Sequence, residues 1–161
     1  MSTRAELLAQ RIEQGAERLA SYAQGLSDAQ WVTTVSPDGR KVGVIIHHVA
    51  SVYPVEVHLA KEIASGRSVE NVTWGVVADM NAQHARDKAS ATRQETITLL
   101  RANAKAAAEA ARALSDAELD SAAPFSLNAG APLTAQFVIE DHALRHSWHH
   151  FAKIQAALAG V

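Results

Sequence analysis

The chain has 161 residues, of which 48% are hydrophobic and 20% are charged, and its formal net charge is −2 at pH 7. This length suits a single domain with its own core, and the balanced charge lacks the basic excess that nucleic-acid-binding proteins carry. The absence of cysteine excludes disulfides, thiolate metal ligands and a cysteine nucleophile.

The amino-terminal segment is charged and amphipathic, without the apolar core of a secretory signal. A capping box of Thr3 and Glu6, followed by apolar residues at helical spacing, predicts a first helix from about Thr3 to Gly25. No apolar run approaches the roughly 20 residues of a membrane span. We therefore expect a cytoplasmic protein with neither a membrane nor a nucleic acid as partner.

The second helix is predicted to begin near Lys41, after a β-turn at "SPDG" (36–39). Its inward stripe follows three- and four-residue steps and contains Val42, Ile45, His48, Val52, Val55, Leu59 and Ile63. Pro54 lies within this helix, where it removes one backbone hydrogen bond and predicts a kink.

The remaining segments complete a bundle. Residues 69–90 predict one or two helical turns that lead into a long helix from about Ala89 to Leu114. The repeated "LSDAQ" (26–30) and "LSDAE" (114–118) each predict a capped turn. Residues 121–134 predict a long loop, and the last helix runs from about Thr134 to Ala159 and stops at Gly160. Four long helices with one long connection predict an all-α four-helix bundle, which we expect to span residues 1–161 as a single domain.

Histidines cluster on the last predicted helix. His142, His146 and His150 are spaced by four residues, so their rings share one strip, whereas His149 points to its side and is expected to be solvated. An i, i+4 pair of histidines can reach one metal ion from a helix. The pair is only a moderate signal unless a third ligand comes from another element.

His48 is the best third ligand, because its place in the apolar stripe must turn it inward. A buried imidazole needs a polar partner. For His48 alone, a hydrogen bond to a backbone carbonyl is an equally good explanation, but the set of three favours a metal. The adjacent His47 lies about 100° away and is expected at the rim. Three histidines suit Zn²⁺, Ni²⁺ or Fe²⁺.

Two stretches resemble the DinB-like superfamily. In "GVIIHHVA" (43–50), His48 is followed by a small apolar pair, and "HSWHHFAKI" (146–154) fits the H-x-x-x-H frame of the family's last helix. Lys153 stands where many members carry glutamine. The resemblance implies a DinB-like four-helix bundle with a long crossover connection and a divalent metal on three histidines. It also implies that the protein is often a homodimer, and characterised relatives include thiol-dependent transferases and isomerases.

The stretch "MNAQHA" (80–85) is similar to a subgroup of this family, which makes Asn81 and His84 candidates for the mouth of a ligand pocket. An exposed residue at a helix start explains His84 equally well. His142, His84 and Asp141 are candidates for handling protons or orienting a ligand.

These residues predict a metal-dependent enzyme, either a thiol S-transferase or a hydrolase, with a small-molecule substrate and a low-molecular-weight thiol as a possible cosubstrate. In a chain without cysteine, the thiol would come from that cosubstrate. One alternative is a protein that binds a metal or small ligand without turnover. Another is a structural bundle whose histidines are satisfied without a metal.

Overall fold

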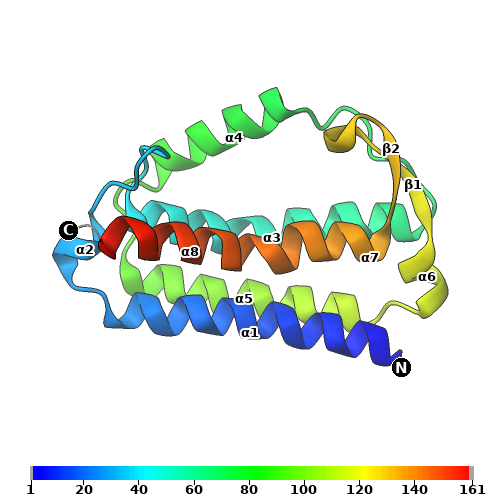
Figure 1. Cartoon of the computed structure of the whole chain (residues 1–161), viewed down its shortest axis with the longest axis horizontal. Helices are drawn as coiled ribbons and strands as arrows, with labels where there is room; N and C mark the ends of the chain where they lie inside the picture. The colour runs from blue at the N-terminus through cyan, green and yellow to red at the C-terminus, as the bar shows by residue number, and fades with distance from the viewer. Residues whose placement is uncertain (1, 160–161) are drawn as a thin grey trace.

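Four long helices run side by side in the computed structural model, which describes residues 2–159 (Figure 1). They are α1 (Thr3–Gly25), α3 (Val42–Ala64), α5 (Arg93–Arg112) and a composite last helix. The composite helix joins α7 (Ala135–Val138), a π-helical segment (Ile139–Leu144) and α8 (Arg145–Ala159). The predicted stop at Gly160 lies outside the described residues.

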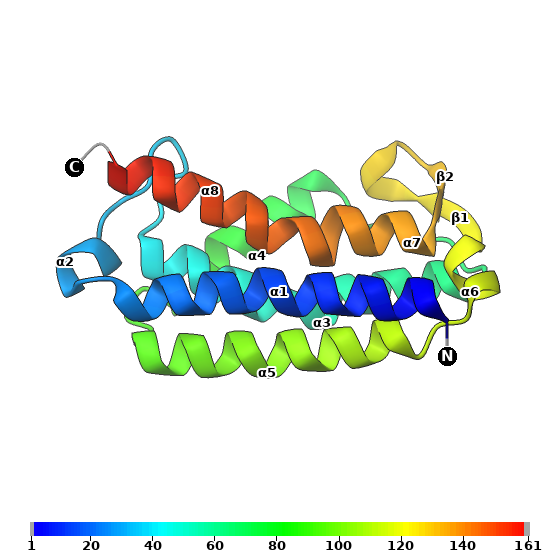
Figure 2. The ribbon, with the colours of Figure 1, turned by 60° about the horizontal axis from the view of Figure 1, so that its bottom comes forward.

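The order of the helices requires a long crossover. Helices α1 and α8 run in one direction, and α3 and α5 run in the opposite one (Figure 1). Helix α5 packs between α1 and α3, and the last helix closes the ring on the other side (Figure 2). Because α3 and α5 are parallel, the chain must return along the bundle between them, and this crossover carries α4 (Trp74–Asp87). The predicted all-α four-helix bundle with a long crossover is confirmed.

Small side chains bring α1 and α5 close together. The buried alanines of these two helices are Ala5, Ala9, Ala16, Ala20, Ala23, Ala104, Ala107, Ala108 and Ala111. Larger side chains of α3, among them Ile45, Ile46, Tyr53 and Ile63, fill the centre of the bundle. Alternating small and large residues in this way achieves the dense packing of a protein interior.

Helix α3 is the central helix of this core. By length and composition it does meet the description of a membrane span, contrary to the sequence analysis, but 67% of its most apolar window is buried inside the bundle. The helix is continuous through Pro54. Proline leaves the carbonyl of Ala50 without its helical donor, and Asn103 of α5 donates a hydrogen bond of 2.8 Å to that carbonyl.

The predicted bounds of α1 are confirmed, but its predicted cap is wrong, and so is the predicted start of α5. Ser2 rather than Thr3 caps α1, because the Ser2 hydroxyl accepts from the backbone N–H of Ala5. Helix α5 begins at Arg93 rather than Ala89, because Thr92 and Glu95 form its capping box. The two capped turns are present as α2 (Asp28–Trp31) and α6 (Asp116–Asp120), each with a capping box.

Two predicted connections contain more structure than expected. The segment before α5 holds the 14-residue helix α4 rather than one or two turns. The predicted loop 121–134 contains an antiparallel hairpin of β1 (Ala122–Phe125) and β2 (Ala131–Thr134). Helix α4 has no buried residue, so its sequence carries no inward apolar stripe. The strands are rich in alanine and proline, which have low β propensity.

Candidate metal centre

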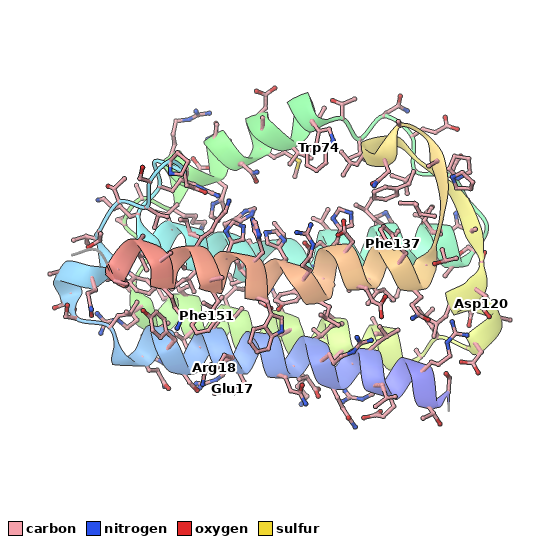
Figure 3. All side chains as sticks on the ribbon, viewed as in Figure 1. Glu17, Arg18, Trp74, Asp120, Phe137 and Phe151 are labelled. Carbon is pink, nitrogen blue, oxygen red and sulfur yellow. The ribbon has the colours of Figure 1, made fainter. Side chains whose placement is uncertain are left out.

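Three histidines from two helices converge on one point. His48 of α3 and His146 and His150 of α8 each place one ring nitrogen within 4.8 Å of the other two. Nε2 of His48 lies 3.1 Å from Nε2 of His146. Nitrogen-rich side chains gather between α8, α3 and α4 in Figure 3. The structure thus brings together the three residues that the sequence analysis selected as metal ligands, and we name them the histidine triad.

Glu56 of α3 orients one member of the triad. Nδ1–H of His146 donates a hydrogen bond to Oε1 of Glu56, which is buried with 6% of its surface exposed. The carboxylate can only accept, so the proton sits on Nδ1, and the lone pair of Nε2 faces the triad. This carboxylate–histidine arrangement recurs behind metal-ligating histidines. Glu56 was not predicted as a site residue, because it lies outside the inward stripe expected from the sequence, and its burial is known only from the structure.

The triad is electrostatically suited to a cation. Burial, together with neighbouring imidazoles and Arg40, lowers the pKa of His48 to about 3 and that of His150 to about 2. Both rings are therefore neutral at physiological pH, and their lone pairs are available. Within the described chain, Nδ1 of His150 and Oε2 of Glu56 are buried without a hydrogen-bond partner. Neutral imidazole donors and unsatisfied polar atoms fit a divalent transition-metal ion.

A cavity of about 570 Å³ opens beside the triad, between α3, α4 and α8. Three of the predicted pocket residues, Asn81, Asp141 and His142, line this cavity, and so does the exposed His149. Helix α4 forms one wall of this cavity, so the crossover between α3 and α5 supplies part of the candidate site.

His142 lies apart from the triad. It belongs to the π-helical segment, where the wider turn breaks the regular four-residue strip that the sequence analysis assumed. Its ring packs against Phe125, with centroids 5.5 Å apart, and its Nε2 lies 3.9 Å from Oδ2 of Asp141. Burial lowers the pKa of His142. Asp141 is held by Arg145, whose Nε donates to it at 2.9 Å.

A second histidine pair lies behind the triad. His47, predicted at the rim, is buried, and its Nδ1 lies 2.9 Å from Nε2 of His84. The hydroxyl of Ser51 is 3.0 Å from the same Nδ1. His84 is partly buried and does not line the cavity, so it is neither an exposed helix-start residue nor part of the pocket mouth. Its pKa is lowered to about 4, mainly by burial. Helix α4 covers this side of α3, which helical phase alone did not predict.

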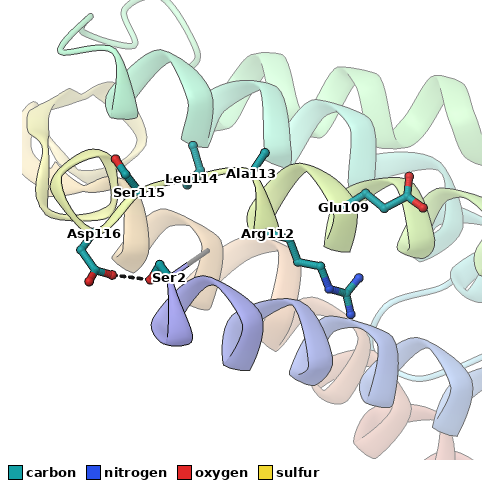
Figure 4. Close-up of a pocket in the computed structure, with 7 residues that line it drawn as sticks. All are labelled: Ser2, Glu109, Arg112, Ala113, Leu114, Ser115 and Asp116. Carbon is teal, nitrogen blue, oxygen red and sulfur yellow. Dashed lines mark hydrogen bonds between the residues drawn. The ribbon is translucent and has the colours of Figure 1, made fainter.

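A larger hollow of about 770 Å³ lies elsewhere, where the start of α1 meets α5 and α6 (Figure 4). Two of its charged side chains, Arg112 and Asp116, already have partners. Arg112 binds Glu6 and Glu13, and Ser2 donates to Asp116. Among residues 2–159, no histidine lines this hollow. The cavity beside the triad is therefore the candidate site.

Comparisons with known proteins identify the family of the chain and agree with its fold. The sequence model of the DinB superfamily matches residues 11–154. Among solved structures, YfiT from Bacillus subtilis superimposes with a TM-score of 0.75 at 17% identity, over 98% of this chain and 87% of that chain. YfiT is described as a probable metal-dependent hydrolase with an unusual four-helix bundle topology. At this identity the likeness shows the fold. No curated protein sequence matches the chain.

Proposed function

Since the chain belongs to the DinB superfamily, we propose that it is a metal-dependent enzyme whose divalent ion is held by His48, His146 and His150. The observation that carries this proposal is the convergence of three imidazoles, one of them oriented by a buried carboxylate, at the wall of a cavity. The description of YfiT as a probable metal-dependent hydrolase supports it.

Each protein group has a distinct part in this proposal. A divalent ion bound to the triad would act as a Lewis acid that lowers the pKa of a water or thiol and polarises a carbonyl. Glu56 keeps the proton of His146 on Nδ1, so that the lone pair of Nε2 stays free to bind the metal ion. His142 has a buried Nε2 without a hydrogen-bond partner in the described chain, and this atom is available to a bound substrate. Asp141 and Asn81 line the same cavity and would orient that substrate.

The proposed reaction is hydrolysis or thiol transfer. A water molecule would be the nucleophile in the first case, and a low-molecular-weight thiol in the second, since the chain has no cysteine of its own. His84 does not line the cavity and is better placed to hold α4 against α3 than to move a substrate proton.

Metal binding is the first test. The protein, purified without a histidine tag and stripped with EDTA, is titrated with Zn²⁺, Ni²⁺ and Fe²⁺ in a calorimeter. We expect about one equivalent per chain for the natural sequence, and loss of binding in His146→Ala. His149→Ala is the matched control, because His149 lies on the same helix outside the triad and should leave binding unchanged. Binding below about a tenth of an equivalent, with no rise in melting temperature on adding Zn²⁺, would contradict the proposal.

The reaction class needs a second experiment. The metal-loaded protein is incubated with ester substrates, and separately with electrophilic acceptors in the presence of low-molecular-weight thiols. Turnover of esters without thiol identifies a hydrolase, and thiol-dependent turnover identifies a transferase. A loaded protein that is inactive in both assays would instead be a protein that binds its metal without turnover.

A further inference from the structure

Arg40 brings a partly used guanidinium group to the wall of the cavity. Its Nε and Nη2 donate to the two carboxylate oxygens of Asp38, at 2.6 and 2.8 Å. The remaining terminal nitrogen, Nη1, is buried and has no hydrogen-bond partner in the described chain. A buried donor without a partner is costly, so a ligand atom that accepts from Nη1 would bind favourably.

The guanidinium is held in place before any ligand arrives. Asp38 also accepts from the backbone N–H of Arg40, and the backbone N–H of Val35 donates to the carbonyl of Arg40 at 2.9 Å. Arg40 and Asp38 line the cavity together with His48 and His150. Arg40 is therefore a preorganised basic side chain of the cavity that holds the triad, and Nη1 is its terminal nitrogen without a partner.

The other charges of the cavity leave room for an anion. Its carboxylates, Asp38, Glu56 and Asp141, each have a basic or imidazole partner. Lys153 also lines the cavity and makes no ion pair within the described residues. Among the carboxylates, Glu56 has a partner only at Oε1, because its Oε2 is buried without a hydrogen-bond partner. Unpaired donors therefore include both Nη1 of Arg40 and the ammonium group of Lys153.

The rest of the wall is apolar. It is built from Val52, Val55, Leu59, Val72, Trp74, Val77 and Met80. Trp74 and Met80 keep 64% and 53% of their surface exposed, so both present apolar surface at the cavity. The indole N–H of Trp74 donates to the carbonyl of Leu127 at 3.1 Å, so the ring is fixed at the start of α4 (Figure 3). An apolar wall with a few placed donors is the usual form of a small-molecule site.

We propose that the substrate is an amphipathic carboxylate, with its head group bound by Nη1 of Arg40 and its apolar body against Trp74, Val77 and Met80. This inference rests on the proposed function and names the substrate class of the same site. One free guanidinium nitrogen matches a singly charged head group, whereas a phosphate dianion generally takes more donors.

Binding of three probes with one apolar body tests the inference. The probes are 4-phenylbutyrate, 4-phenylbutanol and 4-phenylbutylamine, and calorimetry measures them against both metal-free and zinc-loaded protein. We expect the acid to bind at least about tenfold more tightly than the alcohol in both forms, and the amine to bind most weakly. Arg40→Gln should weaken the acid about tenfold and leave the alcohol unchanged.

Arg67→Gln is the matched control. Arg67 binds Glu62 through the same two nitrogens, at 2.7 and 2.8 Å, but lies outside the cavity, so its loss should not change the affinity for the acid. Because Arg40→Gln leaves Asp38 without its cation, the double variant Asp38→Asn/Arg40→Gln is measured as well. It should show the same loss of acid binding while its melting temperature stays close to that of the natural chain.

Several results would overturn the inference. They are equal affinity for acid and alcohol, selectivity that survives in both Arg40 variants, no binding of any probe, or an equal loss in Arg67→Gln. The two proposals fail separately. Selectivity for the acid in a protein that takes up no zinc would contradict only the proposed metal site. Zinc uptake without such selectivity would contradict only the proposed substrate class.

Discussion

His146 differs from the other two residues of the triad because a buried carboxylate holds its ring. The sequence located the triad through two simple facts, the i, i+4 spacing on the last helix and the position of His48 within an apolar stripe. It did not locate Glu56, because the predicted stripe continued through Val52, Val55 and Leu59 and left Glu56 outside it, whereas the structure buries Glu56 and leaves Val55 44% exposed. It also placed His47 at the rim, since helical phase on one helix cannot show that another helix will cover that side.

Removing the charge of Glu56 should weaken the metal site. In Glu56→Gln the amide oxygen can still accept from Nδ1 of His146, but it no longer makes the imidazole more basic, so we expect zinc affinity to fall about 10- to 100-fold. Titration calorimetry with Zn²⁺ measures the loss. Glu62→Gln, on the same helix but outside the cavity, is the control and should bind zinc as the natural chain does. An unchanged affinity in Glu56→Gln would show that the carboxylate has no part in metal binding.

Helix α4 shows what periodicity can and cannot predict. The long helices bury an apolar face, and their sequence patterns predicted them. Helix α4 buries no residue, so its pattern gave no such signal. Polar contacts hold it instead, through Trp74 and Leu127 at its start and through His84 and His47 near its end. The hairpin of β1 and β2 was not predicted either, because short strands rich in alanine and proline have low β propensity.

The His84 contact should control the mobility of α4. In His84→Ala, the end of α4 loses its hydrogen-bonding partner on α3, and we expect faster hydrogen exchange of the amides of residues 81–87. Exchange measured by mass spectrometry, peptide by peptide, gives the readout. Zinc affinity should change less than about twofold, since His84 is not a member of the triad. Exchange rates equal to those of the natural chain would mean that other contacts hold α4.

In the whole molecule, the histidine triad lowers the free energy of unfolding of the metal-free bundle. Two neutral imidazoles, His48 and His150, are enclosed where protonation is unfavourable, and Nδ1 of His150 has no hydrogen-bond partner within the described chain. A metal ion would offset this cost, because it binds the folded chain alone. The homodimer and the cytoplasmic location remain predictions; light scattering that gives the mass of two chains would support the dimer.

Mild acid, below about pH 6.5, should already destabilise the metal-free protein. His48 and His150 have a folded pKa of about 3 and about 2, below the value of roughly 6.5 in the unfolded chain. The unfolded chain therefore binds more protons, and the free energy of unfolding falls as the pH drops below about 6.5. The loss is on the order of 3 kcal/mol per histidine by pH 4.

Urea unfolding in EDTA at several pH values between 7 and 4.5 measures this effect. Carboxylates contribute mainly at lower pH, so the upper part of this window isolates the histidines. The variant His48→Gln/His150→Gln should show a flatter dependence, with a remaining part from His47, His84 and His142, whose pKa values burial also lowers. A natural chain whose stability does not change between pH 7 and pH 5 would argue against buried neutral imidazoles.

The central claim is that one divalent ion sits between His48, His146 and His150. Anomalous diffraction at the zinc edge, from crystals of zinc-loaded protein, tests it most directly. We expect one strong anomalous peak bounded by a ring nitrogen of each of these histidines, at about 2.0–2.1 Å from each. A peak at another position, or hydrogen-bonded histidines with no peak between them in crystals that contain zinc elsewhere, would contradict it.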